Sequence, residues 1–141
     1  MLTPGVILLG WGRVARAFVE EGRGRRWELL GVVGRDRWTG FDGKVGTDLE
    51  SQGGFQSGEV PVQLLLQKAW DLIHTRGLMP VLVDASFGTG TAVWLEGVRG
   101  GGFGVVSANK LPLVALDSGS FEILRRQGLG VRAACGVGLE L

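Results

Sequence analysis

One stretch near the N-terminus decides the fold: Val6-Ile-Leu-Leu-Gly10-Trp-Gly12-Arg-Val-Ala15. Its first four residues are apolar and stand between two glycines, which is typical of a strand buried on both faces of a parallel sheet. Apolar residues at helical spacing predict a helix over residues 13–21, and the glycines that follow end it. Leu29-Leu-Gly-Val-Val33 predicts a second buried strand. Residues 6–34 therefore predict a βαβ unit with parallel strands.

The turn between the first strand and the helix matches the dinucleotide-binding pattern G-x-G-x-x-G/A. Gly10 permits the tight turn, Gly12 carries no Cβ that would block a pyrophosphate, and Ala15 is small enough for close helix packing. The intervening residues belong to the same predicted cofactor site, since N–H groups at the helix start face the phosphates; they are Trp11, Arg13 and Val14. The alternative is a glycine-rich turn that binds nothing.

The rest of the chain continues the alternation of strands and helices. Buried-type strands are predicted over residues 81–83, 104–108 and 130–134, and helices over 62–75, 91–99 and 118–126. Residues 35–60 are polar and rich in glycine, so they are predicted to be mainly loop. The pattern predicts an α/β fold: a Rossmann-like, doubly wound, mostly parallel sheet in three layers, formed by a single domain.

The segment Gly34-Arg-Asp-Arg37 follows the second strand, where the adenosine ribose of a dinucleotide is recognised. Arg35 and Arg37 would pair with the 2′-phosphate of NADP, whereas Asp36 would accept hydrogen bonds from the 2′-hydroxyl of NAD. An acidic residue of that kind normally ends the strand, and Arg35 is closer to that point, so we expect NADP, with NAD as the alternative. A solvated charge cluster at the start of a loop is the structural alternative.

Polar residues also follow two later strands. Asp84 and Ser86 end one, and Ser107, Asn109 and Lys110 end the next. Open α/β sheets bind ligands at the carboxyl ends of their strands, so these side chains are predicted to lie along the nicotinamide half of the cofactor. Alternatively, the first pair caps the helix near Thr91 and the last two form an ordinary turn.

Composition narrows the range of partners. Fifteen Lys and Arg against 14 Asp and Glu give a net charge of +1, which offers no large field for nucleic acid or an anionic membrane. A single cysteine, Cys135, excludes an internal disulfide, and a single histidine, His74, argues against a His/Cys metal site. With no visible targeting segment, the expectation is a cytoplasmic protein without metal.

The order of motifs resembles the N-terminal cofactor domain of homoserine dehydrogenases. The resemblance rests on the glycine turn, on Val83-Asp-Ala-Ser86 for V-D-x-T/S, on Val105-Val-Ser-Ala-Asn-Lys110 for V-V-T-A-N-K, and on Ala134-Cys-Gly-Val-Gly138. It implies hydride transfer between homoserine or aspartate semialdehyde and a nicotinamide. Lys110 would be the catalytic lysine near the substrate oxygen, while Ser86, Ser107 and Asn109 would hold the ribose and the carboxamide.

The family continues beyond the Gly-x-Gly segment into a substrate domain, whereas here Gly138 is followed by three residues. The expectation is a dinucleotide-binding domain over residues 1–141 without a substrate domain, inactive alone, since Lys110 would lack the groups that fix a substrate. A separate substrate-domain chain or a homodimer would complete it. The alternative is a stand-alone, non-catalytic dinucleotide-binding or regulatory module.

Overall fold

The computed structural model describes residues 2–22, 26–43, 54–87, 90–99 and 101–107, and the backbone of 130–131. Within these residues the strands are β1 (Pro4–Leu9), β2 (Glu28–Val33), β3 (Arg37–Gly40), β4 (Gln56–Ser57), β5 (Met79–Asp84), β6 (Gly104–Ser107) and β7 (Gly130–Val131). The helices are α1 (Arg13–Gly22), α2 (Val62–Arg76) and α3 (Ala92–Gly97).

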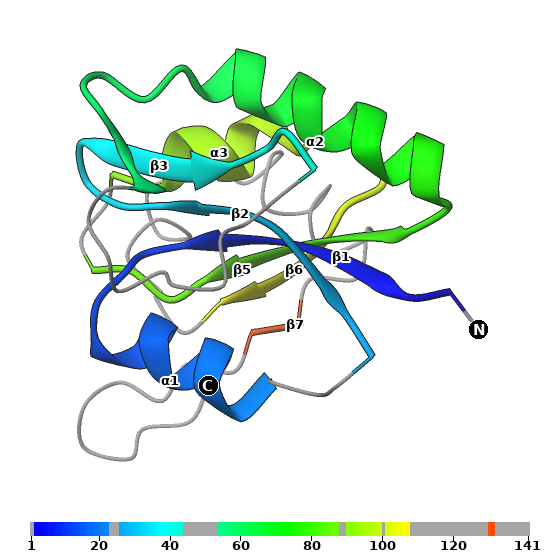
Figure 1. The fold of residues 1–141 in the computed structure, drawn as a ribbon, viewed down its shortest axis with the longest axis horizontal. Coiled ribbons are helices and arrows are strands. Elements are labelled where there is room, and N and C mark those ends of the chain that lie inside the picture. The colour runs from blue at the N-terminus through cyan, green and yellow to red at the C-terminus, as the bar shows by residue number, and fades with distance from the viewer. Residues whose placement is uncertain are drawn as a thin grey trace.

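These strands form one sheet in the order β4-β3-β2-β1-β5-β6-β7. The run from β2 through β1, β5 and β6 to β7 is parallel, whereas β3 and β4 are added antiparallel at the β2 edge. Helix α1 covers one face of the sheet, and α2 and α3 cover the other (Figure 1). The predicted three-layer, mostly parallel, Rossmann-like fold is confirmed.

The central strand is β1, which pairs with β2 on one side and β5 on the other. Its apolar run is buried throughout, because both faces lie under helices and both edges are paired. Ile7 and Leu9 face the larger core, beneath α2 and α3. Val6 and Leu8 face the smaller core on the α1 side, where Ala15 is fully buried. The predicted close approach of the first helix to the sheet is therefore observed.

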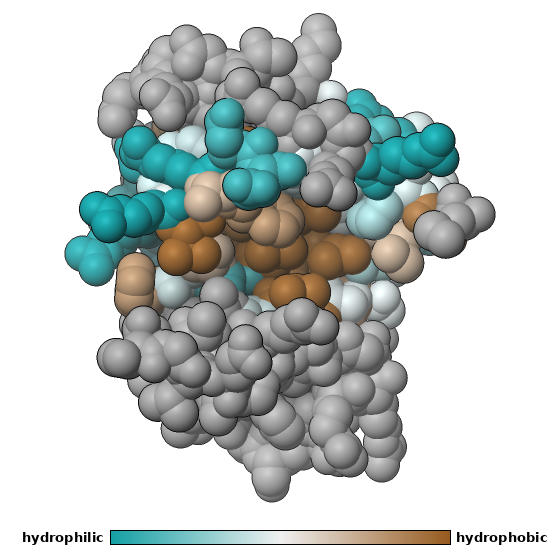
Figure 2. Space-filling model, turned by 90° about the horizontal axis from the view of Figure 1, so that it is seen from below, coloured by the Kyte–Doolittle hydropathy of each residue, from teal (hydrophilic) through white to brown (hydrophobic). Residues whose placement is uncertain are grey.

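The α1 face of the sheet carries one exposed hydrophobic side chain among the described strand residues of β6. Val106 of β6 is 45% exposed, and strand alternation turns it to the α1 side because Val105 belongs to the opposite core. Seen from below Figure 1, this face gathers hydrophobic residues in its middle, with hydrophilic residues on its flanks (Figure 2).

The prediction of mainly loop over residues 35–60 is wrong where β3 and β4 lie. Strand β3 turns back on β2 through a two-residue loop, Arg35 and Asp36, which the Gly34 N–H closes by donating to the Arg37 carbonyl at 2.8 Å. Trp38 and Thr39 favour strands, and Thr39 is buried. The other predicted elements differ from the observed ones by a few residues at their ends. The predicted helix 118–126 and all but 130–131 of the last strand lie outside the described residues.

Candidate dinucleotide site

A cavity of about 740 Å³ opens at the carboxyl ends of β1, β2 and β5. The chain leaves β1 toward β2 on one side, and β5 lies on the other side of β1, so the cavity is at the topological switch point of the sheet. This is where open α/β sheets bind their ligands. Of the residues predicted to bind a cofactor, those that line it are Gly10, Trp11, Gly12, Arg13, Val14, Arg35 and Ser86.

The glycine turn presents bare main chain to the cavity. Gly10 has a φ of +107°, a backbone conformation that favours glycine, and its N–H donates to the Val33 carbonyl at 2.7 Å. A Cβ built on Gly12 would meet no protein atom within 4 Å, so the backbone there faces open cavity. A bulky anion can therefore approach the main chain at Gly12, as the sequence pattern predicts.

Two helices begin at this cavity. Val14 lies in the first turn of α1 and Val62 is the first residue of α2, and both line the cavity. Neither first turn contains an acidic side chain that would offset the partial positive charge of the helix end. The dipoles of the two helices thus favour an anion at this end of the cavity.

The two-residue loop after β2 carries opposite charges to the cavity rim. Arg35 and Asp36 are both exposed and both line the cavity. The Gly58 N–H donates to the Asp36 carbonyl at 2.9 Å, which ties this loop to the segment after β4. Arg37 does not line the cavity; its guanidinium carbon lies 4.8 Å from the centre of the Phe55 ring. The structure therefore separates the two arginines that the sequence grouped.

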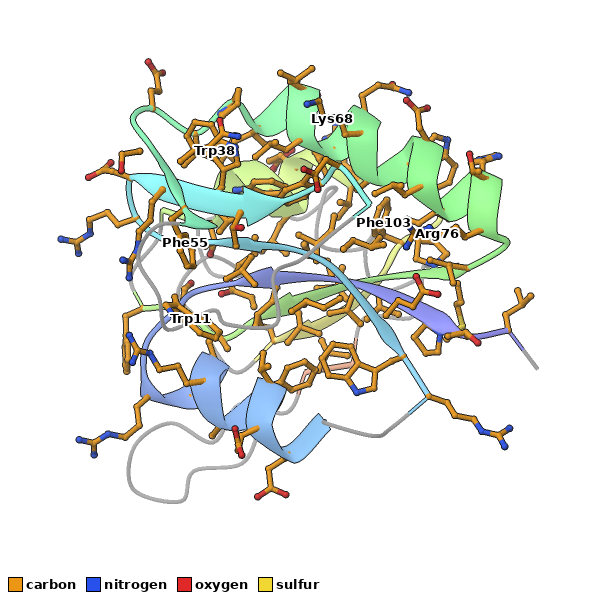
Figure 3. The ribbon with its side chains drawn as sticks, viewed as in Figure 1. Trp11, Trp38, Phe55, Lys68, Arg76 and Phe103 are labelled. Carbon is orange, nitrogen blue, oxygen red and sulfur yellow. The ribbon has the colours of Figure 1, made fainter. Side chains whose placement is uncertain are left out.

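Aromatic and cationic side chains form a row beside the glycine turn. The rings of Trp11 and Phe55 are 6.3 Å apart, and both lie on the side of the molecule where the glycine turn is (Figure 3). At one end of the row, Arg16 lies over the Trp11 ring, with its guanidinium carbon 5.4 Å from the ring centre. With Arg37 on Phe55, this row links the turn after β1 to the β3–β4 edge. Nothing in the sequence pattern pointed to Phe55.

Asp84 and Ser107 occupy neighbouring positions at the ends of β5 and β6, and both are fully buried. Neither lines the cavity. The Asp84 carboxylate instead accepts hydrogen bonds from Ser86 and Thr91, which do line it. Asn109 and Lys110 lie outside the described residues, so their predicted roles stay predictions.

Much of the apolar cavity wall was not predicted. It comes from the segment before α2, from the start of that helix, from the residues after β5, and from α3: Val60, Val62, Phe87, Val93 and Trp94. Phe87 is 89% exposed, so it projects from the cavity rim into solvent. Such residues carry no motif, because they meet only through the fold.

Two features are absent from the described part of the chain. No three side chains among its His, Cys, Asp and Glu residues lie together in a way that could hold a metal ion. None of its helices combines the length and the apolar character that crossing a lipid bilayer requires.

No protein-family model and no curated protein matches the sequence. Solved structures do match by fold. A hyperthermophilic archaeal homoserine dehydrogenase in complex with NADPH superimposes with a TM-score of 0.65 at 17% identity, over 93% of this chain and 44% of that one. The homoserine dehydrogenase of Thermoplasma acidophilum gives a TM-score of 0.51 at 18% identity, over 98% and 46%.

The chain has a homoserine-dehydrogenase-like fold. The resemblance inferred from the motifs is thereby confirmed at the level of the fold, and only as a distant similarity. A Candida auris protein of unknown function matches equally well, with a TM-score of 0.67 at 14% identity over 94% of this chain and 39% of that one. The chain spans less than half the length of each of these structures.

Proposed function

We propose that this chain is the NADP(H)-binding domain of an oxidoreductase similar to homoserine dehydrogenase. The observation that carries the proposal is the open space over Gly12, in a cavity at the switch point of the sheet where two helices begin. The cavity also has the right scale, because pockets for small ligands and cofactors span roughly 300–1,000 Å³.

The residues present fit a dinucleotide phosphate. The pyrophosphate would lie over the turn from Gly10 to Val14, at the start of α1. Arg35, exposed on the cavity rim, would pair with the 2′-phosphate; the residue that follows β2 is Gly34, which offers no carboxylate for a 2′-hydroxyl. Arg37 would add to the positive charge from behind Phe55. When bound, the nicotinamide would accept or donate the hydride.

The proposed reaction is the interconversion of homoserine and aspartate semialdehyde. Lys110 would lie near the substrate oxygen, with Ser86, Ser107 and Asn109 on the ribose and the carboxamide; these roles rest on the motif resemblance. The NADPH complex of the archaeal homoserine dehydrogenase supports the choice of cofactor. Because the chain spans 44% of that enzyme, we propose that the groups that hold the substrate lie outside these 141 residues.

The test begins with the 141-residue chain and isothermal titration of NADPH and NADH. We expect NADPH to bind more tightly, by about ten-fold or more, because a charge-assisted contact to phosphate contributes roughly 1.5–3 kcal/mol. Failure to bind either cofactor would refute the proposal.

A second assay supplies homoserine with NADP, then aspartate semialdehyde with NADPH. We expect binding without turnover. Sustained turnover would show that the chain needs no further part. Binding without turnover, even when the missing substrate-holding part is added, would favour a non-catalytic module.

A further inference from the structure

The carboxylate of Asp84 is completely buried behind the cavity wall, yet it is hydrogen-bonded to two residues of that wall. The Ser86 N–H donates to Asp84 Oδ1 at 3.0 Å, and the Ser86 hydroxyl donates to the same oxygen at 2.5 Å. The Thr91 hydroxyl donates to Asp84 Oδ2 at 2.6 Å. Both carboxylate oxygens therefore accept from residues that face the cavity.

These hydrogen bonds fix the direction of the two hydroxyls. A hydroxyl has a single proton to donate, and an ionised carboxylate can only accept. The Ser86 and Thr91 oxygens are 3.5 Å apart, much farther than either is from Asp84, so each proton is directed to the carboxylate. Toward any other partner both hydroxyl oxygens act as acceptors.

Thr91 is held by Asp84 rather than by its own helix. It occupies the N-cap position of α3, where a threonine hydroxyl usually accepts a hydrogen bond from the first turn. Here the side chain makes no such bond. Its orientation at the cavity wall therefore depends on the carboxylate.

We infer that the Ser86–Thr91 wall recognises hydrogen-bond donors, and that Asp84 is the positioning residue that gives it this character. The inference rests on the proposed function, under which the donors are ribose hydroxyls or the N–H₂ of the nicotinamide carboxamide. Phosphate oxygens are anionic acceptors, so they meet the wrong polarity here, in front of a buried carboxylate. The phosphates belong instead over Gly12 and beside Arg35.

The first test uses Thr91→Val, which keeps the shape of the side chain and removes the acceptor, with Thr91→Ser as the matched control. Isothermal titration of the 141-residue chain should show about five- to ten-fold weaker NADPH binding for Thr91→Val, which is the effect of one lost hydrogen bond. Thr91→Ser should bind like the wild type. Equal affinity of Thr91→Val and wild type would overturn the inference.

A second arm identifies the donor. NADPH is compared with analogues that each lack one donor: an acetylpyridine analogue without the carboxamide N–H₂, and analogues deoxygenated at one ribose position. One of these analogues lacks the donor that Thr91 recognises. Wild type and Thr91→Val should bind that analogue equally, because no hydrogen bond remains for the substitution to remove. If the Thr91→Val penalty is the same for every analogue, the wall does not recognise a donor.

Asp84→Asn tests the positioning role. The amide N–H₂ donates where the carboxylate accepted, so one hydroxyl must turn its proton toward the cavity. We expect weaker NADPH binding, and no further loss when Thr91→Val is added. Additive losses would contradict a role exerted through Thr91. If Asp84→Asn does not fold, the comparison of Thr91→Val with Thr91→Ser still decides the inference. If the wild type binds no dinucleotide, it is the proposed function that fails.

Discussion

Gly10 lies against the end of β5: a Cβ built on Gly10 would be 2.8 Å from the carbonyl oxygen of Ala85. The Ala85 N–H donates to the Leu9 carbonyl at 2.9 Å, which holds these two chain segments together. Two residues on, a Cβ on Gly12 would meet no atom within 4 Å. The two glycines of the turn are therefore required for different reasons, the first by the protein and the second by the proposed ligand.

This difference predicts opposite outcomes for two substitutions. Gly10→Ala should lower the free energy of unfolding by about 2 kcal/mol or more, because it combines a backbone clash with a φ unsuited to L-residues. Gly12→Val should leave the free energy of unfolding within about 0.5 kcal/mol of wild type, as expected for a side chain in open space. It should nevertheless abolish NADPH binding, because the branched side chain fills the space over the main chain.

Urea denaturation and NADPH titration of both variants give the measurement. Unchanged NADPH affinity in Gly12→Val would mean that the turn is only structural. A stability of Gly10→Ala equal to that of wild type would mean that the turn can move away from β5.

Arg35→Ala should remove the preference for NADPH over NADH. The guanidinium is exposed on the cavity rim, so its loss should weaken NADPH binding by about 10- to 100-fold and leave NADH binding nearly unchanged. Lys68→Ala is the matched control, since it removes the same charge from an exposed position on α2 that does not line the cavity (Figure 3). Equal losses for both cofactors, or an equal effect of the control, would contradict a specific phosphate contact.

The first strand and the glycine turn could be predicted because each is local. A four-residue apolar run between glycines fits only a few environments, and the pattern from Gly10 to Ala15 carries its geometry in consecutive residues. The β3 strand was missed because it lies near one end of the sheet, between β2 and the two-residue edge strand β4, where polar and glycine residues are tolerated. Thr91 was invisible as a wall residue because its orientation is set by Asp84, seven positions away, through a hydrogen bond that only the fold creates.

Trp11 should report dinucleotide binding by its fluorescence. Its ring is half-buried and lines the cavity, so a ligand over Gly12 would lie close to it. Trp11→Phe should remove most of the NADPH-induced quenching of tryptophan emission. The matched control is Trp70→Phe. The Trp70 ring does not line this cavity and packs against Phe103, with 5.7 Å between the ring centres. NADPH should quench the emission of this variant as it quenches that of wild type. Quenching lost equally in both variants would mean that the ligand does not lie over the glycine turn.

Gly31 of β2 lies under the ring of Phe41, and a Cβ on Gly31 would overlap that ring. Phe41 is 2% exposed and has a φ of +66°, the single positive φ at a non-glycine position in the described ranges. The backbone adopts this costly conformation while the ring is buried in the core beneath α2 and α3. The glycine therefore provides the space that the strained phenylalanine occupies.

Gly31→Ala should accordingly destabilise the protein by about 1–3 kcal/mol, the usual cost of overfilling a core, and lower the melting temperature. Gly104→Ala in β6 is the control, because its Cβ would meet the Pro80 carbonyl oxygen at an ordinary 3.8 Å. A second variant, Gly31→Ala with Phe41→Leu, should recover part of the loss, since the smaller side chain vacates the overlapping volume. Thermal unfolding of the four proteins, wild type included, measures this. If Gly31→Ala and Gly104→Ala melt alike, the ring is not fixed over the glycine, and the bend after β3 is free to relax.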